Sequence, residues 1–261
     1  MSPTAGARPP GARYKLIVGG VLLYLLFLAA QMPAVWLAGR LPADSPIQLR
    51  QIEGNLWQGA AGHVVWHAGI DSLDLGPLRW TLQPIELFRG GLGVAFELGQ
   101  VAEPLKGQLR YAGDGIHLHA VQGAIDAPVL GFASRALSLL QPQGKLMLEI
   151  AELHLSGNRI HGAAQADWRD ARSGLVAAPL GDYRAELRAD PDGRRARITV
   201  QTQQGAVAIS GNGDYHPDKG LSGRFVLLPP QDERRERYTP VLNMLGRPDA
   251  SGAWVLNLDT R

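Results

Sequence analysis

Residues Leu92–Leu98 read LGVAFEL and carry Leu92, Val94, Phe96 and Leu98 at alternate positions. Side chains of a β-strand point alternately to opposite faces, so this spacing predicts a strand with one apolar and one polar face. The chain of 261 residues also contains 32 glycines and 18 prolines, which favours many turns and short elements over long helices. We therefore expect a mainly β protein.

The same alternation returns along most of the chain. Glycine, aspartate and asparagine separate the apolar runs, as in Gly113-Asp114-Gly115, and such turns are typical of β-hairpins. The pattern predicts an antiparallel, curved, meander-like sheet, open-barrel or sandwich-like, whose apolar face must be curled or covered. A phase break at Ala151–Glu152 predicts a β-bulge. Further strands are predicted at Ile47–Ile52, Gly115–Val121, Leu146–Leu155, Tyr183–Ala189, Ala196–Thr202, Ala206–Ser210, Leu221–Leu228 and Trp254–Leu258.

Helical patterns are scarce and short. Val129–Leu140 predicts an amphipathic helix, and Asp232–Leu245 predicts a second one that ends at Gly246. Pro240 predicts a kink in the second helix. We find no composition break within residues 47–261 and expect them to form one β-rich domain.

One long apolar stretch lies near the N-terminus. Leu16–Ala30 contains no charged residue, and apolar character continues to Leu37 after a single glutamine. A helix over 16–37 would be about 33 Å long, enough to cross a hydrocarbon core of about 30 Å. Because the stretch is longer than a typical signal-peptide core, we favour a retained transmembrane helix over a cleaved signal peptide.

The charges around this stretch predict its orientation. Arg8, Arg13 and Lys15 precede it, whereas Arg40 alone follows it directly, which places the N-terminus in the cytoplasm. Trp36, with Arg13, Lys15 and Arg40, is expected at the membrane interface. We thus expect a single-pass inner-membrane protein of a Gram-negative cell. Its parts are a cytoplasmic basic tail at 1–15, a transmembrane helix at 16–37, a linker at 38–46 and a periplasmic domain at 47–261.

Charge and cysteine content exclude several classes of function. The formal net charge is +2, and residues 1–15 hold three cations and no acid, so the rest of the chain is close to neutral. It lacks the basic footprint of a nucleic-acid-binding protein, and we expect no nucleic acid as partner. The chain has no cysteine, which excludes disulfides, cysteine-ligated metal sites and thiol nucleophiles.

Motifs of catalysis are absent from the sequence. It contains no His-Glu-x-x-His, no Gly-x-Ser-x-Gly and no phosphate-binding glycine loop. His117 and His119 would leave the same face of a strand as a metal pair, with a third ligand from elsewhere, such as His154 or Asp114. Structural zinc almost always has four ligands, so we interpret the two histidines as part of the polar face of the sheet. We expect no catalytic, cofactor or metal site.

Clusters of tryptophan, glycine and proline carry a further signal. Their order, their spacing and their position after one N-terminal apolar stretch resemble the type II secretion system protein N family, over nearly the whole chain. Asn55 departs from the family pattern, which has a small hydroxyl residue there. The clusters are Met32–Trp36 (MPAVW), Gly54–Ala61 (GNLWQGAA), Leu75–Pro84 (LGPLRWTLQP) with Leu87–Leu92 (LFRGGL), and Leu245–Gly252 (LGRPDASG) with Ala253–Leu256 (AWVL). The motif residues are Gly54, Leu56, Trp57, Gly59, Trp80, Pro84, Gly90, Gly246, Arg247, Pro248, Asp249 and Gly252.

The resemblance implies a non-enzymatic inner-membrane component of the machine that exports folded periplasmic proteins across the outer membrane. Its implied partners are other secretion subunits, such as the inner-membrane platform and the secretin. We expect Trp57 and Trp80 to pack the first hairpins, Pro84 to start a short turn, and Gly246 with Pro248-Asp249 to cap the last helix. A free sheet edge is expected to dock a partner by β-augmentation.

The alternative interpretation is a periplasmic lipid-handling protein. A curved sheet behind a membrane anchor also resembles the AsmA-like proteins. In that case the apolar concave face would hold acyl chains in an open groove lined by leucine, valine and phenylalanine. A scaffold, in contrast, should fill the groove with its own side chains.

Overall fold

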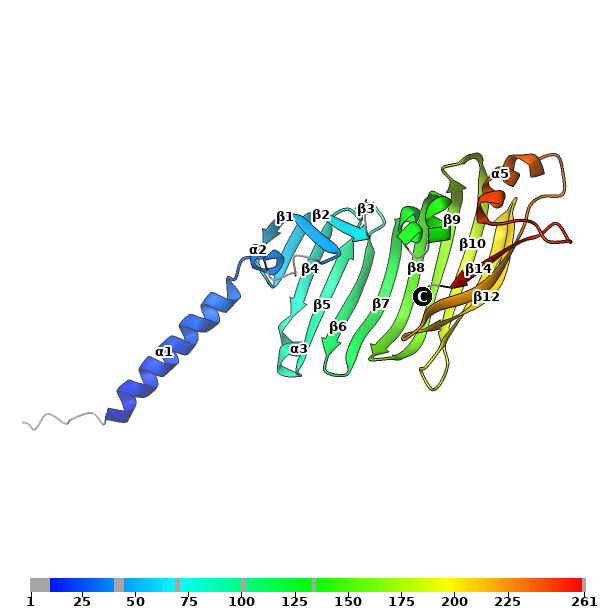
Figure 1. Cartoon of the computed structure of the whole chain (residues 1–261). Helices are drawn as coiled ribbons and strands as arrows, with labels where there is room; N and C mark the ends of the chain where they lie inside the picture. Colours follow the sequence, from blue (N-terminus) through cyan, green and yellow to red (C-terminus); the bar gives the residue numbers. More distant parts are fainter. Residues whose placement is uncertain (1–9, 40–44, 69–70, 100–101, 133–134, 260–261) are drawn as a thin grey trace, which may run out of the picture.

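One large sheet, preceded by a helix, makes up the computed structural model, which describes residues 10–39, 45–68, 71–99, 102–132 and 135–259 (Figure 1). The sheet has 14 strands, and their order in space follows their order in the chain, with only β3 off this path. Every strand pairs antiparallel with its neighbours. The strands are β1 (Ile47–Gly54), β2 (Gln58–Ala68), β3 (Asp71–Asp74), β4 (Leu78–Gln83), β5 (Gly91–Leu98), β6 (Leu105–Ala112), β7 (Gly115–Asp126), β8 (Pro142–Ser156), β9 (Arg159–Ser173), β10 (Val176–Ala189), β11 (Ala196–Gly205), β12 (Ala208–His216), β13 (Gly220–Leu228) and β14 (Trp254–Asp259).

The predicted antiparallel meander is confirmed. Each strand expected from alternation overlaps an observed strand, and the predicted bulge is present as a register shift between Glu149 and Glu152 of β8. All described strands belong to one open sheet, so no second sheet of a sandwich is found among them. Strands such as β6 and β9 escaped prediction because glycine, alanine and polar residues occupy many of their positions.

Helices are few and most are short. The predicted helix at 129–140 is replaced by the 3₁₀ turn η1 (Ala127–Phe132) and by α4 (Arg135–Leu139). The predicted C-terminal helix is present as α5 (Arg235–Leu245), with Pro240 inside it and Gly246 directly after it. The others are α1 (Pro10–Ala30), α2 (Val35–Ala38) and α3 (Pro84–Phe88).

The N-terminal helix differs from the one predicted. It projects away from the sheet (Figure 1) and ends at Ala30 instead of continuing to Leu37. Pro33 accounts for the break, because proline has no backbone N–H and disfavours helical backbone in the residue before it. Among the residues that the structure describes, no helix has the length and apolar character needed to cross a membrane.

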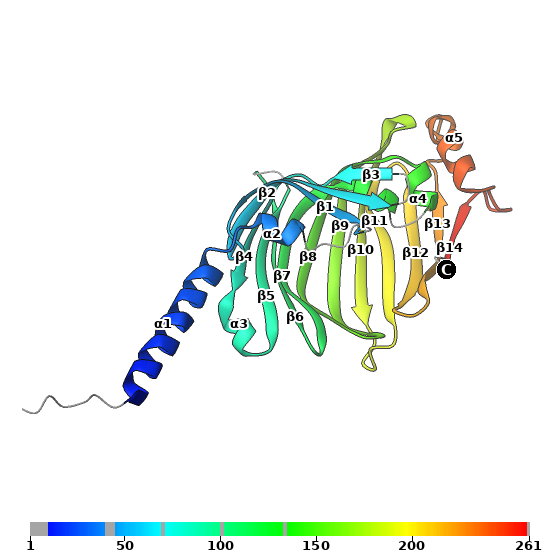
Figure 2. The same cartoon turned by 60° about the vertical axis from the view of Figure 1, so that its left-hand side comes forward.

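The sheet is strongly curved toward its C-terminal end. Trp168 of β9 and Tyr183 of β10 share a core cluster with Leu227 of β13 and Trp254 of β14, so strands far apart in the sheet face one another. In Figure 2, β1 and β3 run across the upper ends of the central strands. The ring of Trp66 in β2 stacks on Phe132 of η1 with centroids 5.0 Å apart. The apolar face therefore becomes a trough that is partly covered at both ends.

Candidate functional site

Two of the sequence clusters meet where the chain leaves α1. Residues 32–36 and residues 54–61 form one unit, which we call the junction. Because its bonds join segments some 20 residues apart, the direction in which the chain leaves α1 is tied to the first hairpin. The backbone contacts are the Ala34 N–H to the Gly54 carbonyl at 3.2 Å, the Leu56 N–H to the Met32 carbonyl at 2.7 Å, and a β-bridge between Pro33 and Asn55.

Trp80 fills the apolar side of the junction. Its side chain packs against Ala34 and Ala61, which are buried, and its Nε1–H donates to the Leu56 carbonyl at 3.1 Å. Gly59 lies against the indole, since a Cβ at this position would be 2.3 Å from Trp80 Cζ2. Only glycine permits so close an approach of the backbone to the ring.

Trp57 has a different place from the one expected. Its Nε1–H donates to the Ala29 carbonyl at 2.9 Å, so the side chain contacts the last turn of α1. The Oδ1 atom of Asn55 accepts the N–H groups of Trp57 at 3.0 Å and Gln58 at 2.8 Å. Serine and threonine hydroxyls form similar turns, which explains how asparagine serves at position 55.

The second cluster builds an ionic network around one buried carboxylate. Pro84 is the first residue of α3, where its missing N–H costs no helical bond, and Gly90 follows the helix with a φ of +77°. Glu86 of α3 is buried and accepts hydrogen bonds from Arg89 and Arg110, both at 2.8 Å. Burial raises the pKa of Glu86, but the two arginines outweigh this effect and lower it.

The C-terminal cluster forms the turn between α5 and β14. The Oδ1 atom of Asp249 accepts the hydroxyl of Ser251 at 2.6 Å and the N–H groups of Ser251 at 2.8 Å and Ala253 at 3.1 Å. These bonds lower the pKa of Asp249. Pro248 forms a β-bridge with Trp254, which is buried. The remaining cluster residues are Gly246 with a φ of +152°, the exposed Arg247 and Gly252 with a φ of +79°.

The residues expected at the membrane interface are only partly described. Trp36 is half exposed, and its N–H donates to the Pro33 carbonyl at 3.1 Å. Arg40 and the side chains of Arg13 and Lys15 lie outside the described residues. The described apolar side chains of α1 are all exposed.

An apolar cavity of about 230 Å³ lies in the curved C-terminal half of the trough. Its lining comes from strands β8 to β13, from β14, and from the helices above them. The Tyr183 hydroxyl donates to the Val207 carbonyl at 2.9 Å, and burial raises the pKa of this phenol. Lining side chains include Leu146, Trp168, Val200, Phe225 and Leu256.

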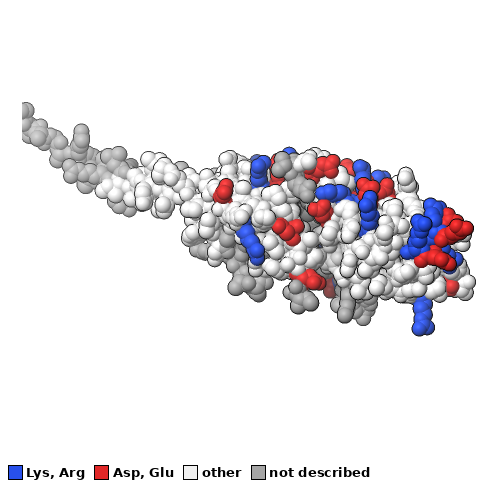
Figure 3. Space-filling view, turned by 90° about the horizontal axis from the view of Figure 1, so that it is seen from above, with Lys and Arg blue, Asp and Glu red and all other residues white. Residues whose placement is uncertain are grey.

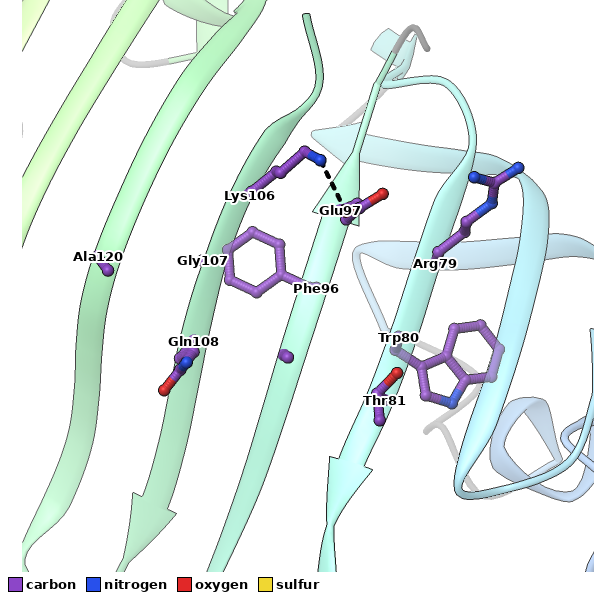
Figure 4. Close-up of a pocket in the computed structure, with 10 residues that line it drawn as sticks. Arg79, Trp80, Thr81, Phe96, Glu97, Lys106, Gly107, Gln108 and Ala120 are labelled. Atoms are coloured by element: carbon purple, nitrogen blue, oxygen red, sulfur yellow. Dashed lines mark ion pairs between the residues drawn. The ribbon is translucent and has the colours of Figure 1, made fainter.

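The opposite face of the sheet is polar. Seen from above the strand ends, acidic and basic side chains are interleaved and gather at the end that carries α5, whereas the described part of α1 shows neither charge (Figure 3). A hollow of about 410 Å³ lies between β4, β5, β6 and β7 (Figure 4). Glu97 and Lys106 form an ion pair of 2.9 Å there, with Arg79 and Gln108 beside them. None of these is a histidine or a nucleophile paired with a base.

Metal-ligating side chains converge at one place among the described residues. Ligand atoms of Asp114, His117 and His154 all lie within 4.8 Å of one another. His119 does not belong to this group, because its ring centroid is 6.3 Å from that of His117. The structure thus brings Asp114 and His154, the possible third ligands named from the sequence, to His117. The pair His117 and His119 does not itself form the group.

Two strands form the ends of the sheet. β1 pairs only with β2, and β14 pairs only with β13. The bridge between Pro248 and Trp254 covers the first residue of β14, which leaves β1 as the longer free edge among the described residues. The junction lies at the end of β1, so this edge starts beside the base of α1.

Comparisons with known proteins give a consistent result. A family model described as type II secretion system (T2SS), protein N matches residues 45–257. The chain is also 25% identical to the type II secretion system protein N of Vibrio cholerae serotype O1 (strain ATCC 39315 / El Tor Inaba N16961), with 94% of this chain and 96% of that protein covered. No solved structure matches the chain.

Proposed function

The chain belongs to the type II secretion system protein N family, and on this basis we propose that it is a non-enzymatic scaffold that docks other secretion subunits along the free edge of β1. The observation that carries the proposal is that β1, eight residues long, has a strand on one side only among the described residues. An unpaired edge offers a row of backbone donors and acceptors to an incoming strand.

The junction supports docking at this edge. It ties β1 to the segment that follows α1, so a partner strand added to β1 would sit at a fixed distance from the base of α1. A subunit of the inner-membrane platform or the secretin would then be held close to the membrane. The polar hollow and the ionic network around Glu86 would contribute to specificity and not to chemistry.

Site-directed cross-linking tests this proposal. The chain has no cysteine, so Gln48→Cys places one thiol on β1. Gln201→Cys is the matched control, because Gln201 is also exposed but its strand β11 is paired on both sides. In native membranes, a thiol-reactive cross-linker should join a secretion subunit to the Gln48→Cys variant and not to the Gln201→Cys variant. Equal adducts from both variants, or adducts from neither, would refute docking at β1.

The same proposal has the apolar stretch 16–37 of the sequence cross the inner membrane, with the N-terminus in the cytoplasm and the sheet in the periplasm. Support comes from the uncharged run Leu16–Ala30, from Arg13 and Lys15 before it, and from the exposed apolar side chains of α1. The cysteine at position 48 also tests this topology. A thiol reagent that does not cross the inner membrane should label it once the outer membrane is made permeable. Labelling that requires lysis of the inner membrane would overturn the placement.

The apolar cavity favours a second candidate function, the holding of an acyl chain. A cavity of about 230 Å³ lined by leucine, valine and phenylalanine is large enough for an apolar ligand, since engineered apolar cavities of about 150 Å³ stay dry and bind benzene. Ala185 lines the cavity, and Ala185→Phe should fill it. Native mass spectrometry of the full chain, extracted in mild detergent, should find lipid on the wild type and less on this variant. Lipid-free wild-type protein would refute the candidate.

A further inference from the structure

Four of the seven histidines of the chain stand together on the polar face of β7, β8 and β9. His117 is directly opposite His154, and His154 is directly opposite His161. Each lies next to a residue of the apolar cluster made by Leu118, Leu153 and Ile160, so the histidines point to the other face. We call His117, His119, His154 and His161 the histidine row.

Two members of the histidine row, His117 and His154, contact Asp114, which lies in the turn before β7. The Nε2 atom of His117 is 3.0 Å from Asp114 Oδ2, and the Nε2 atom of His154 is 3.2 Å from the Asp114 carbonyl oxygen. The two imidazole rings stack with centroids 3.9 Å apart and an interplanar angle of 10°. Both Nε2 atoms and a carboxylate oxygen thus face one small volume.

The surroundings suit a cation. Asp114 supplies a carboxylate oxygen, the one acidic ligand atom of the group. Arg110 is opposite His117 in the sheet, but its guanidinium is held by Glu86 at 2.8 Å. His117 is well shielded, with 13% of its side chain exposed, whereas Asp114 is more than half exposed and leaves a path for an ion.

We infer that Asp114, His117 and His154 bind one divalent transition-metal ion, with Zn²⁺ as the representative case. Imidazole nitrogen and carboxylate oxygen are the ligands that Zn²⁺ takes at about 2.0–2.2 Å. Ligand atoms of a tetrahedral zinc ion are about 3.3 Å apart, so the three atoms, which lie within 4.8 Å of one another, would move closer together on binding. Binding would displace the contacts that the two Nε2 atoms now make with Asp114.

Three protein ligands leave at least one coordination position open. A four-coordinate ion would complete its shell with water or with a side chain from a partner, which is the pattern of open zinc sites. The ring of His161 lies against Gly193, where a Cβ would be 2.5 Å from its Cε1 atom, and its centroid is 6.2 Å from that of His154. His161 is thus a neighbour of the three ligands and does not belong to their group.

Metal binding to the purified full chain in detergent tests the inference. After removal of metal with a chelator, Zn²⁺ is titrated by calorimetry, and bound zinc is counted by equilibrium dialysis. We expect one zinc ion per chain. His117→Ala and His154→Ala should each weaken binding by more than about 10-fold, the smallest loss that follows removal of even an outer-sphere partner. If an alanine variant does not fold, His117→Gln or His154→Gln replaces it in the titration, because glutamine keeps a polar side chain on the polar face of the sheet.

His63→Ala is the matched control. His63 also contacts an aspartate, with Nδ1 2.6 Å from Asp74 Oδ2, but it belongs to no group of three ligands. Zinc should bind this variant as it binds the wild type. Zinc should also raise the Tm of the wild type and the control, and leave that of the His117 and His154 variants unchanged. The inference is wrong if the wild type binds less than one ion per chain, or if the variants bind zinc as tightly as the wild type.

Discussion

Gly59→Ala should destabilise the junction through a clash with Trp80. The new Cβ would lie 2.3 Å from Cζ2, 2.7 Å from Cε2 and 2.9 Å from Cη2 of the indole. The ring cannot move away freely, because it is buried and its Nε1–H is bonded to the Leu56 carbonyl. Overpacking of this kind costs about 1–3 kcal/mol. At about 2–4 °C per kcal/mol, the Tm should fall by about 2–12 °C.

A double-mutant cycle with Trp80→Leu shows whether the clash is the cause. The free energy of unfolding is measured for the wild type, both single variants and the double variant by urea denaturation followed by circular dichroism. Gly59→Ala should lower the free energy of unfolding clearly less in the Trp80→Leu background than in the wild type. The coupling energy between the two substitutions should be about 0.5–3 kcal/mol. Gly90→Ala is the control: position 90 has a φ of +77° but no atom within 4 Å of the new Cβ, so its cost should not depend on Trp80. Equal costs of Gly59→Ala in both backgrounds would refute the packing argument.

Three further perturbations test other contacts. Tyr183→Phe removes the only described donor to the Val207 carbonyl and should cost about 1–2 kcal/mol in urea denaturation; an unchanged midpoint would contradict this. Arg184 lowers the pKa of Asp167 in the folded protein by hydrogen bonding. This ion pair therefore stabilises the fold fully above pH 3.8, the ordinary pKa of aspartate. Its contribution is lost as the pH falls through the lowered pKa of the folded state. The Tm of Asp167→Asn should therefore fall less steeply below pH 3.8 than that of the wild type, and parallel curves would argue against the pair. Trp57→Phe removes the bond to the last turn of α1 and should speed proteolysis between α1 and β1 without changing the Tm of the sheet, whereas an unchanged cleavage rate would contradict that role.

Local periodicity predicted most strands of the sheet but not all of them. The run LGVAFEL predicted β5 through its alternation alone, since Leu92 is exposed and Val94, Phe96 and Leu98 are only partly buried. β9 was missed because its two large buried side chains, Ile160 and Trp168, are far apart in the strand, among alanines and charged residues. The end of α1 was also misplaced. The apolar run continues past Ala30 and hides the effect of Pro33, whose β-bridge to Asn55 shows that the chain has left the helix.

The candidate sites depend on contacts that no local pattern contains. The spacing of His117 and His119 drew attention to a pair on one strand, whereas the structure groups His117 with His154 through the register of β7 and β8. Within β7, Ala120 has a φ of +48°, an irregularity that no local pattern predicts. The motif glycines were recognisable in the sequence. Position 59 requires glycine, however, because the ring of Trp80, 21 positions further along the chain, leaves no space for a Cβ.

The strand order has a consequence for how the protein is made. Since each strand pairs with the strands next to it in the chain, β3 aside, every strand can find its partner as soon as it emerges, and no pairing must wait for the distant terminus. Most of these pairs close a short loop, so their entropic cost is small; the longer connections, 127–141 between β7 and β8 and 229–253 between β13 and β14, contain the short helices. During synthesis the growing end of the sheet would always be the newest strand, and it would be covered by the next one. The outer edge of β1 stays uncovered from the first hairpin to the finished sheet, so it is available to a partner before the sheet is complete.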